Sequence, residues 1–262
     1  MIIFAHRSTM RTARKLAGVL GVEVSRPKDT DDIVIRWGSR GMPEARYEIN
    51  PLPHLDKADQ RERLAGHGIS VPRAWDPVRY PFMYPVLGRP RRHSRGRDFY
   101  LCKSMKDVER AMMNGCEYFS EWINKTGELR VHCAHGKILC IQDKVLDGDK
   151  GTFSGKPWVT VDRKDWNLDL CQQCLMSLEV LGKDFGAVDV MKFTGGFAIC
   201  EVNLAPALGG RYVFEKYVQY LSWIKRFAPQ PHWGWRKFRK AESLAWKNPQ
   251  FNKGLANSED AE

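Results

Sequence analysis

The chain has 262 residues, with 42 Lys or Arg against 31 Asp or Glu, so its formal net charge is +11. Aromatic residues make up 11% of it, which excludes a mainly disordered chain. No apolar run reaches the roughly 18–20 residues that a membrane-spanning helix needs, so an integral membrane protein is excluded. The chain does not begin like a secretory signal, and its seven Cys are scattered. These features predict a cytoplasmic protein with reduced thiols.

The basic residues gather in three stretches, at residues 1–28, 86–103 and 232–240. Such clusters attract polyanions, either nucleotide phosphates or nucleic acid. A solvated basic face is the simpler interpretation, and it suffices for the first and the last stretch. Cys171 and Cys174 have the spacing of a zinc site, but no second pair completes four ligands, so two thiols on one helix face are expected.

The first 50 residues have the pattern of a small α/β unit. Met1–Ala5 and Asp32–Trp37 are apolar strand candidates, and the amphipathic Thr9–Leu20 predicts a helix between them. The Pro-rich Asn50–His54 then limits regular structure. Asp56–Gly66 predicts the next helix.

Further along the chain, a short strand, two helices and two hairpins are expected. The strand is Gly68–Pro72, and the helices are Asn167–Leu181 and Tyr212–Phe227. The hairpins are Leu129–His135 with Ile138–Lys144, around Gly136-Lys137, and Phe185–Phe193 with Phe197–Val202, around Thr194–Gly196.

The second hairpin carries three side chains with oxygen ligands. Asp189 lies six residues before Gly195 and Glu201 six after it, so a turn centred there places the two carboxylates opposite each other. Asn203 follows on the same face as Glu201. Two desolvated carboxylates need a partner, and hard oxygen ligands suit Mg²⁺. A solvent-facing pair of acids at a hairpin edge is the alternative that this spacing leaves open.

These residues and five further blocks resemble the ATP-grasp superfamily in the same order. FGAVDV at 185–190 followed by EVNLAP at 201–206 resembles its metal-binding end. The earlier blocks are Lys57 with LAGHGISVP at 64–72, PVLGRP at 85–90, YFSEWI at 118–123 and ELRVH at 128–132, and Gly209-Gly210 follows the last motif.

The resemblance implies an α+β fold in which two α/β subdomains enclose ATP, preceded by a short, truncated α/β N-terminal unit. The expected divisions are 1–50 for that unit, 51–118 for the small subdomain, 119–228 for the large subdomain with the metal site, and 229–262 for a basic, Trp-rich extension. The compact length looks like stand-alone phage or bacterial ligases of the RimK and glutathione-synthetase branches.

The resemblance also implies a role for each matching residue. Asp189, Glu201 and Asn203 would hold Mg²⁺, which Mn²⁺ could replace. Lys144 would reach the transferring phosphoryl group, and Arg130 would face the acyl-accepting site. The residues implied to bind ATP are Lys57 and Arg89 at the phosphates, Glu121, Trp122 and Ile123 at adenine, and Glu128 at the ribose.

The phosphate loop departs from the family pattern. It should be rich in Gly, because backbone N–H groups must approach the phosphates closely, but this loop reads RPRRHSRGR over 89–97. His93, Ser94, Arg95 and Gly96 are the candidates for loop contacts to ATP.

The function implied is an ATP-dependent ligase that joins a small-molecule or peptide carboxylate to an amine through an acyl phosphate. Two alternatives stay open. One is a nucleic-acid-binding module. A hybrid of this alternative with the leading function is a ligase whose substrate is acidic or attached to nucleic acid. The other keeps the fold but phosphorylates a hydroxyl group.

Overall fold

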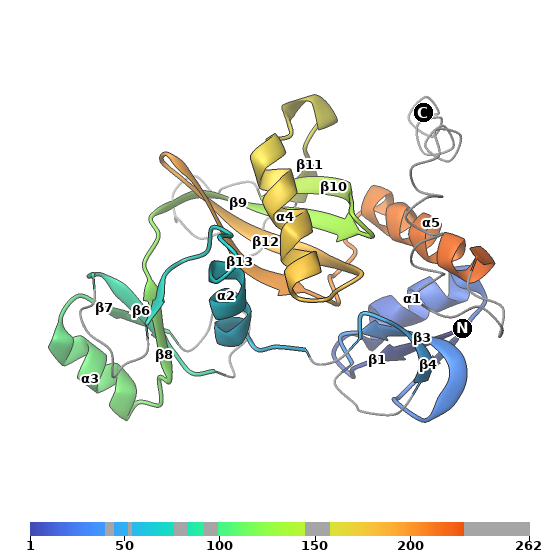
Figure 1. Ribbon diagram of the computed structural model, residues 1–262, viewed down its shortest axis with the longest axis horizontal. Coiled ribbons are helices and arrows are strands. Elements are labelled where there is room, and N and C mark those ends of the chain that lie inside the picture. Colours follow the sequence, from blue (N-terminus) through green and yellow to red (C-terminus); the bar gives the residue numbers. More distant parts are fainter. Residues whose placement is uncertain (40–44, 52–53, 76–82, 92–98, 145–157, 228–262) are drawn as a thin grey trace.

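The computed structural model describes residues 1–39, 45–51, 54–75, 83–91, 99–144 and 158–227. It contains three sheets arranged in a row, with the largest in the middle (Figure 1). Within these residues, no helix is long and apolar enough to cross a membrane. The predicted C-terminal extension, 229–262, lies outside them.

The N-terminal sheet is parallel, in the order β2-β1-β3-β4. Its strands are β1 (Ile2–Ala5), β2 (Glu23–Ser25), β3 (Thr30–Trp37) and β4 (Ala45–Ile49). Helix α1 (Met10–Leu20) follows β1 and packs its apolar side on the sheet. The sequence predicted β1, α1 and β3, but β2 is too short to show an alternating pattern.

The small sheet is antiparallel, in the order β5-β8-β6-β7. Its strands are β5 (Ala74–Trp75), β6 (Val86–Arg89), β7 (Tyr100–Cys102) and β8 (Tyr118–Glu121). Helix α3 (Met105–Met113) covers one face, where Val108 and Ala111 pack with Phe119.

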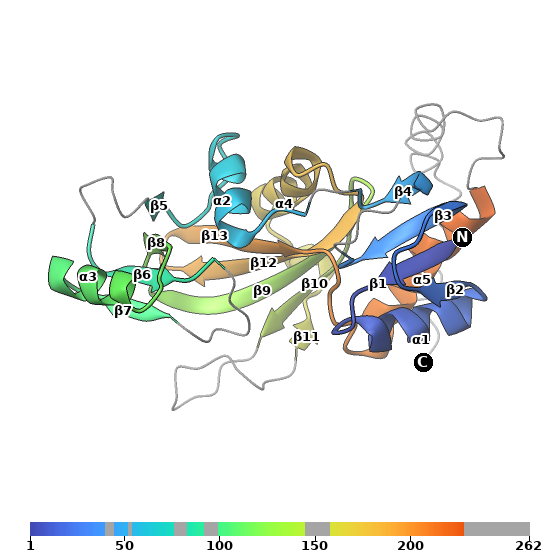
Figure 2. The ribbon, with the colours of Figure 1, turned by 90° about the horizontal axis from the view of Figure 1, so that it is seen from below.

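The large sheet is antiparallel, in the order β11-β10-β9-β12-β13. Its strands are β9 (Lys125–Ala134), β10 (Lys137–Lys144), β11 (Trp158–Thr160), β12 (Phe185–Phe193) and β13 (Gly196–Asn203). A 3-10 turn at Arg163–Asp165 leads into helix α4 (Leu168–Val180), and helix α2 (Lys57–Ala65) lies at the edge strand β13. Figure 2 shows α2 and α4 on the same side of the sheet.

One face of the large sheet is apolar and covered by α4. Val131, Val188 and Val202 pack there with Cys174 and Leu178 of the helix. Because strand side chains alternate between faces, their polar neighbours project to the opposite face. Cys171 and Cys174, both on α4, are buried free thiols in this core.

Two local expectations were wrong. Residues 68–72 form no strand; Ser70 only accepts one backbone hydrogen bond, from Ile199 N at 2.7 Å, and this does not extend into a ladder. The first hairpin turns at His135-Gly136 instead of Gly136-Lys137, with φ of 51° and 71°. A two-residue turn with positive φ at both positions matches the twist of the flanking strands, which leaves Lys137 as the first residue of β10.

The N-terminal sheet and the large sheet share a core through helix α5 (Arg211–Phe227). Trp37 of β3 stacks on Phe185 of β12 at 5.3 Å, and Tyr217 of α5 meets the edges of both rings. Asn50, which is fully buried with φ 58°, accepts hydrogen bonds from the backbone of Asp184 and Phe185 and donates one to Phe185 O. The two sheets are therefore joined by a common core and by side-chain-to-backbone bonds.

Candidate active site

A line of polar residues crosses four strands on the face of the large sheet that α4 does not cover. Gln142 lies opposite Arg130, Arg130 opposite Asp189, and Asp189 opposite Glu201. Directly opposite residues of antiparallel strands share a face, so these side chains project together. The pairing of Asp189 with Glu201 that the sequence predicted is present.

A β-bulge produces this pairing. Val190 lies opposite Ile199 while Asp189 lies opposite Glu201, so Cys200 is one extra residue in β13. Phe193 pairs directly with Gly196, so the turn contains two residues and is not centred on Gly195. Without the extra residue, Asp189 would face Cys200, and Glu201 would point to the apolar side.

Arg130 binds both carboxylate oxygens of Asp189. Its Nε lies 2.6 Å from Oδ1 and its Nη2 2.9 Å from Oδ2, a two-point geometry that is strong and directional. Burial raises the pKa of Asp189 to about 6; Arg130 counters this, and the nearby Glu201 and Glu128 add to it. Negative charge is therefore crowded here, and a further cation would relieve it.

Glu128 lies two residues before Arg130 on β9 and holds two lysines. Lys144 Nζ is 3.1 Å from one carboxylate oxygen, and Lys125 pairs with the other. Burial raises the pKa of Glu128, but the two lysines outweigh it, so the pKa falls below its ordinary value. Glu128 is thus a fixed anion and hydrogen-bond acceptor beside the line.

Trp158 of β11 lies against the cations of this face. Its ring centroid is 4.8 Å from the Arg130 guanidinium carbon and 5.4 Å from Lys144 Nζ. Stabilisation of a cation by a Trp ring is worth about 0.5–1 kcal/mol at an exposed site and more when the pair is desolvated. The ring therefore helps to orient two side chains with predicted catalytic roles.

Lys57, the first residue of α2, reaches Glu201 from outside the sheet. Its Nζ lies 2.6 Å from Glu201 Oε2, and both side chains are about three-quarters buried. Asp56 caps the helix by accepting hydrogen bonds from Ala58 N and Asp59 N. The cap fixes the start of α2 and therefore the position of Lys57, its first residue. In this arrangement each acid of the Asp189–Glu201 pair has its own cation.

Arg89 ends β6 opposite Tyr118 of β8. Burial raises the pKa of Tyr118, against the lowering influence of Arg61, Arg89 and Lys57, so these three cations converge near its hydroxyl. Arg91 is engaged elsewhere: its Nη1 lies 3.0 Å from Asp56 and 2.9 Å from Asp59.

The predicted adenine edge begins at the end of β8. Glu121 N donates to Arg73 O at 2.8 Å, and Trp122 N donates to Pro85 O at 3.2 Å. These two donors are therefore occupied within the protein, while the Trp122 side chain is exposed. Ile123 follows them before β9 begins. The candidate loop residues His93, Ser94, Arg95 and Gly96 lie outside the described residues.

The oxygen donors fit a hard cation in part. Asp189 and Glu201 share a face, and Asn203 follows on β13, but Asn203 Oδ1 accepts a hydrogen bond from Ala205 N at 3.0 Å. In the described part of the chain, no group of three or more His, Cys, Asp or Glu side chains forms a metal centre by itself. Two carboxylates and one amide oxygen fit a Mg²⁺ ion that takes its remaining ligands from water and substrate phosphates.

The relationship of this chain to known proteins is visible in its fold. No protein-family model matches the sequence, and no curated protein matches it. The D-alanine–D-alanine ligase from Bacillus anthracis, solved with ATP, is similar over 87% of this chain and 98% of its own, with a TM-score of 0.58 and 13% identity. The ATP-grasp ligase PsnB, complexed with a phosphomimetic variant of its minimal precursor, Mg and ADP, is similar over 80% of this chain and 91% of its own, with a TM-score of 0.55 and 13% identity. The chain has the ATP-grasp fold.

A third similar structure is the macrocyclase MdnC from Microcystis aeruginosa MRC, bound with precursor peptide MdnA. The likeness covers 84% of this chain and 98% of MdnC, with a TM-score of 0.54 and 14% identity. The ATP-grasp fold expected from the sequence motifs is therefore confirmed over most of the chain.

Several residues on the site face of this ATP-grasp fold were missed from the sequence. Trp158 contacts Lys144 from the neighbouring strand, which no local spacing reveals, and Lys125 pairs with Glu128 three residues along the same strand β9. His132 lies two residues after Arg130 and is fully buried, with Nε2 3.0 Å from Gln142 Oε1 and Nδ1 3.2 Å from Tyr217 Oη. The alternation of Glu128, Arg130 and His132 along β9 was the signal that could have identified His132 as their buried neighbour.

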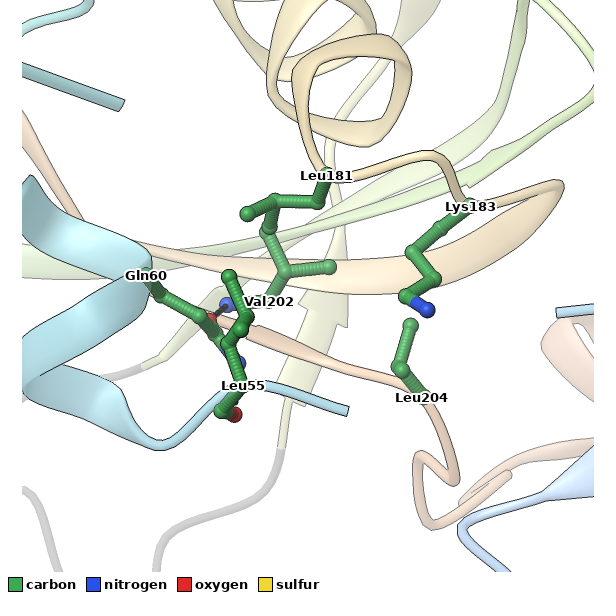
Figure 3. A pocket seen from close by; sticks show the side chains of 6 residues that line it. All are labelled: Leu55, Gln60, Leu181, Lys183, Val202 and Leu204. Atoms are coloured by element: carbon green, nitrogen blue, oxygen red, sulfur yellow. Dashed lines mark hydrogen bonds between the residues drawn. The ribbon is translucent and has the colours of Figure 1, made fainter. Parts of the chain in front are cut away.

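A small cavity lies beside β13, lined by residues in or next to α2 and β13 and by the segment after α4 (Figure 3). The lining residues are Leu55, Gln60, Leu181, Lys183, Val202 and Leu204. Its volume is about 10 Å³, which holds at most one water molecule. It is too small for a nucleotide and lies apart from the Arg130–Glu201 line.

Proposed function

We propose that this protein is an ATP-dependent carboxylate–amine ligase that activates the carboxylate as an acyl phosphate. The observation that carries the proposal is the line Arg130–Asp189–Glu201 on the face of an ATP-grasp sheet that α4 does not cover, with Lys57 and Lys144 beside it. Acids that suit a metal and cations that suit phosphate and carboxylate thus stand within one site.

The nucleotide would extend from the end of β8 to α2. Lys57 and Arg89 would neutralise the phosphates, because both belong to the cations that converge near Tyr118. Glu121, Trp122 and Ile123 would form the adenine edge, with the exposed Trp122 ring offering a stacking surface. Glu128 would accept hydrogen bonds from the ribose hydroxyls.

Asp189, Glu201 and Asn203 would hold Mg²⁺, with Mn²⁺ as a substitute. When bound, the cation would withdraw charge from the phosphates during phosphoryl transfer. Lys57 and Arg130, which neutralise Glu201 and Asp189 here, would then be able to turn toward phosphate and substrate.

Arg130 would orient the substrate carboxylate, and Lys144 would stabilise charge on the transferring phosphoryl group. The Nε and Nη2 atoms of Arg130 donate hydrogen bonds to Asp189, so Nη1 is the nitrogen that would donate to a substrate oxygen. Trp158 and Glu128 restrict both cations, and fixed charges act on a transition state without the cost of reorganisation.

The substrate would be a peptide or a small molecule with a carboxylate. Support for a peptide comes from two structures of the same fold, PsnB with precursor peptide PsnA2 and MdnC with precursor peptide MdnA. The net charge of +11 favours an acidic substrate, including one attached to nucleic acid.

The test is release of ADP in the presence of Mg²⁺ and pooled carboxylates and amines. Omission of the amine and addition of hydroxylamine should trap the activated carboxylate as a hydroxamate. A stable phosphoester formed from a hydroxyl substrate, with no hydroxamate, would contradict the ligase and favour a kinase. Salt-sensitive binding to single-stranded nucleic acid without ATP turnover would favour a binding module instead.

A further inference from the structure

Glu201 owes its position to the extra residue Cys200. In β13 the pairs from Phe193–Gly196 to Val190–Ile199 follow one regular register, and the pairs from Asp189–Glu201 onward are shifted by one residue. A bulge leaves one residue unpaired in the ladder, so something outside the ladder must favour it over regular pairing.

Helix α2 supplies that contact at the outer edge of β13. Arg61 Nε donates to Cys200 O at 3.2 Å, and its Nη2 lies 3.5 Å from Cys200 Sγ. Gln60 Oε1 accepts a hydrogen bond from Val202 N at 3.0 Å (Figure 3). Together, the bonds to Cys200 and Val202 let one turn of α2 bind the strand on both sides of Glu201.

Arg61 is unusual for its burial. Only 2% of the residue is exposed, and the ion pairs among the described residues do not include it. A buried guanidinium without an acid partner is costly, whereas an apolar side chain would suit a helix face packed on a sheet. The bond to the Cys200 carbonyl is the contact that distinguishes Arg61 from such a side chain.

We propose that Arg61 is a positioning residue that maintains the Cys200 bulge and thereby holds Glu201 on the metal-binding face. The inference rests on the proposed metal role of Glu201. Loss of Arg61 frees β13 to return to regular alternation, which turns Glu201 toward the apolar face and removes one carboxylate from the site.

The first test compares Arg61→Met and Arg61→Lys in the full chain, with Arg63→Met as control. Arg63 lies on the same helix but is exposed. The readout is Mn²⁺ affinity at saturating ADP, measured by electron paramagnetic resonance. We expect affinity to fall about tenfold in Arg61→Met, to recover in Arg61→Lys because one donor can still reach the carbonyl, and to be unchanged in Arg63→Met. Wild-type affinity in folded Arg61→Met would overturn the proposal.

If Arg61→Met does not fold, Arg61→Gln takes its place. This variant removes the guanidinium that contacts Cys200 O and Sγ but keeps a polar side chain at the position, and we expect the same loss of Mn²⁺ affinity to a smaller extent. An unchanged affinity would refute the proposal.

The second test removes the bulge. Deletion of Cys200 extends the regular register and still places Glu201 opposite Asp189, so Arg61→Met should not weaken Mn²⁺ binding in this background. An equal loss in both backgrounds would show that Arg61 does not act through the bulge.

The wild-type protein separates this inference from the proposed function. If wild type does not bind Mn²⁺ with ADP, the proposed metal site itself is wrong. If wild type binds it and the Arg61 variants bind it equally, only the positioning role is wrong.

Discussion

Arg130 and Asp189 lie opposite each other on β9 and β12, and the guanidinium of Arg130 holds both carboxylate oxygens of Asp189. The residue predicted to bind substrate therefore neutralises a residue predicted to bind metal. Occupation of the site by a cation and by a carboxylate substrate should then depend on each other.

Arg130→Gln should show this dependence in two measurements. Turnover should fall roughly 10²-fold, because a misaligned substrate reacts slowly. Mn²⁺ affinity without nucleotide should rise, because Asp189 loses its competing cation. The two quantities can be followed by ADP release and by Mn²⁺ titration. Unchanged values of both would contradict the assigned role of the pair.

Asp189→Asn and Glu201→Gln should each abolish Mg²⁺-dependent turnover, because each removes an anionic ligand while preserving side-chain shape. Asp143→Asn is the matched control, since Asp143 pairs with Lys192 at 2.6 Å on the same sheet but outside the site. Thermal unfolding would check that the variants fold. Full activity in both site variants would show that the metal assignment is wrong.

Arg89→Ala should weaken ATP binding more than Arg91→Ala. Arg89 ends β6 near Lys57 and Tyr118, whereas Arg91 is held by Asp56 and Asp59. Loss of a charged hydrogen bond to phosphate is worth about tenfold or more in affinity. Titration calorimetry with a non-hydrolysable ATP analogue compares the two, and equal effects would indicate a diffuse basic surface.

His132 should make the free energy of unfolding depend on pH. Burial lowers its pKa to about 4 in the folded protein, against about 6.5 when it is unfolded. Between these values only the unfolded state binds the proton, so stability rises with pH across this window and is constant above it. The loss from pH 6.5 to 4 should approach about 3 kcal/mol.

Urea denaturation of wild type and His132→Gln over this range measures the effect. The variant should show a shallower slope between pH 4 and 6.5, while at pH 8 the two proteins should differ by a constant amount that reflects packing alone. Parallel curves at all pH values would rule out His132 as the source.

The sequence predicted the long periodic elements, because their apolar residues repeat over several turns or strand positions. Short elements were missed from the sequence, although α3 begins at a recognisable N-cap: Ser104 Oγ accepts a hydrogen bond from Asp107 N, and the Asp107 carboxylate accepts from Ser104 Oγ and from Lys103 N. Gly68–Pro72 has strand-like residues but only one backbone bond to β13, so local preference alone was misleading.

The sequence correctly predicted that Asp189 lies opposite Glu201, but with the wrong turn. A hairpin turn centred on Gly195 would give this pair, whereas the structure forms the pair through a two-residue turn and a bulge at Cys200. Arg61 stabilises this bulge from a helix 139 positions earlier, and no local pattern contains that information. The contact of Trp158 with Arg130 escaped for the same reason.

The hydrogen bonds of Asn50 limit how this chain can be shortened. An enzyme engineer who wished to keep only the catalytic core would cut before the Pro-rich segment, just after Asn50. That cut would remove the side chain that satisfies the backbone of Asp184 and Phe185, and it would strip Trp37 from Phe185 and Tyr217. The fragment would expose an aromatic surface and self-associate. The first 50 residues therefore stabilise β12 directly and are not a separable unit.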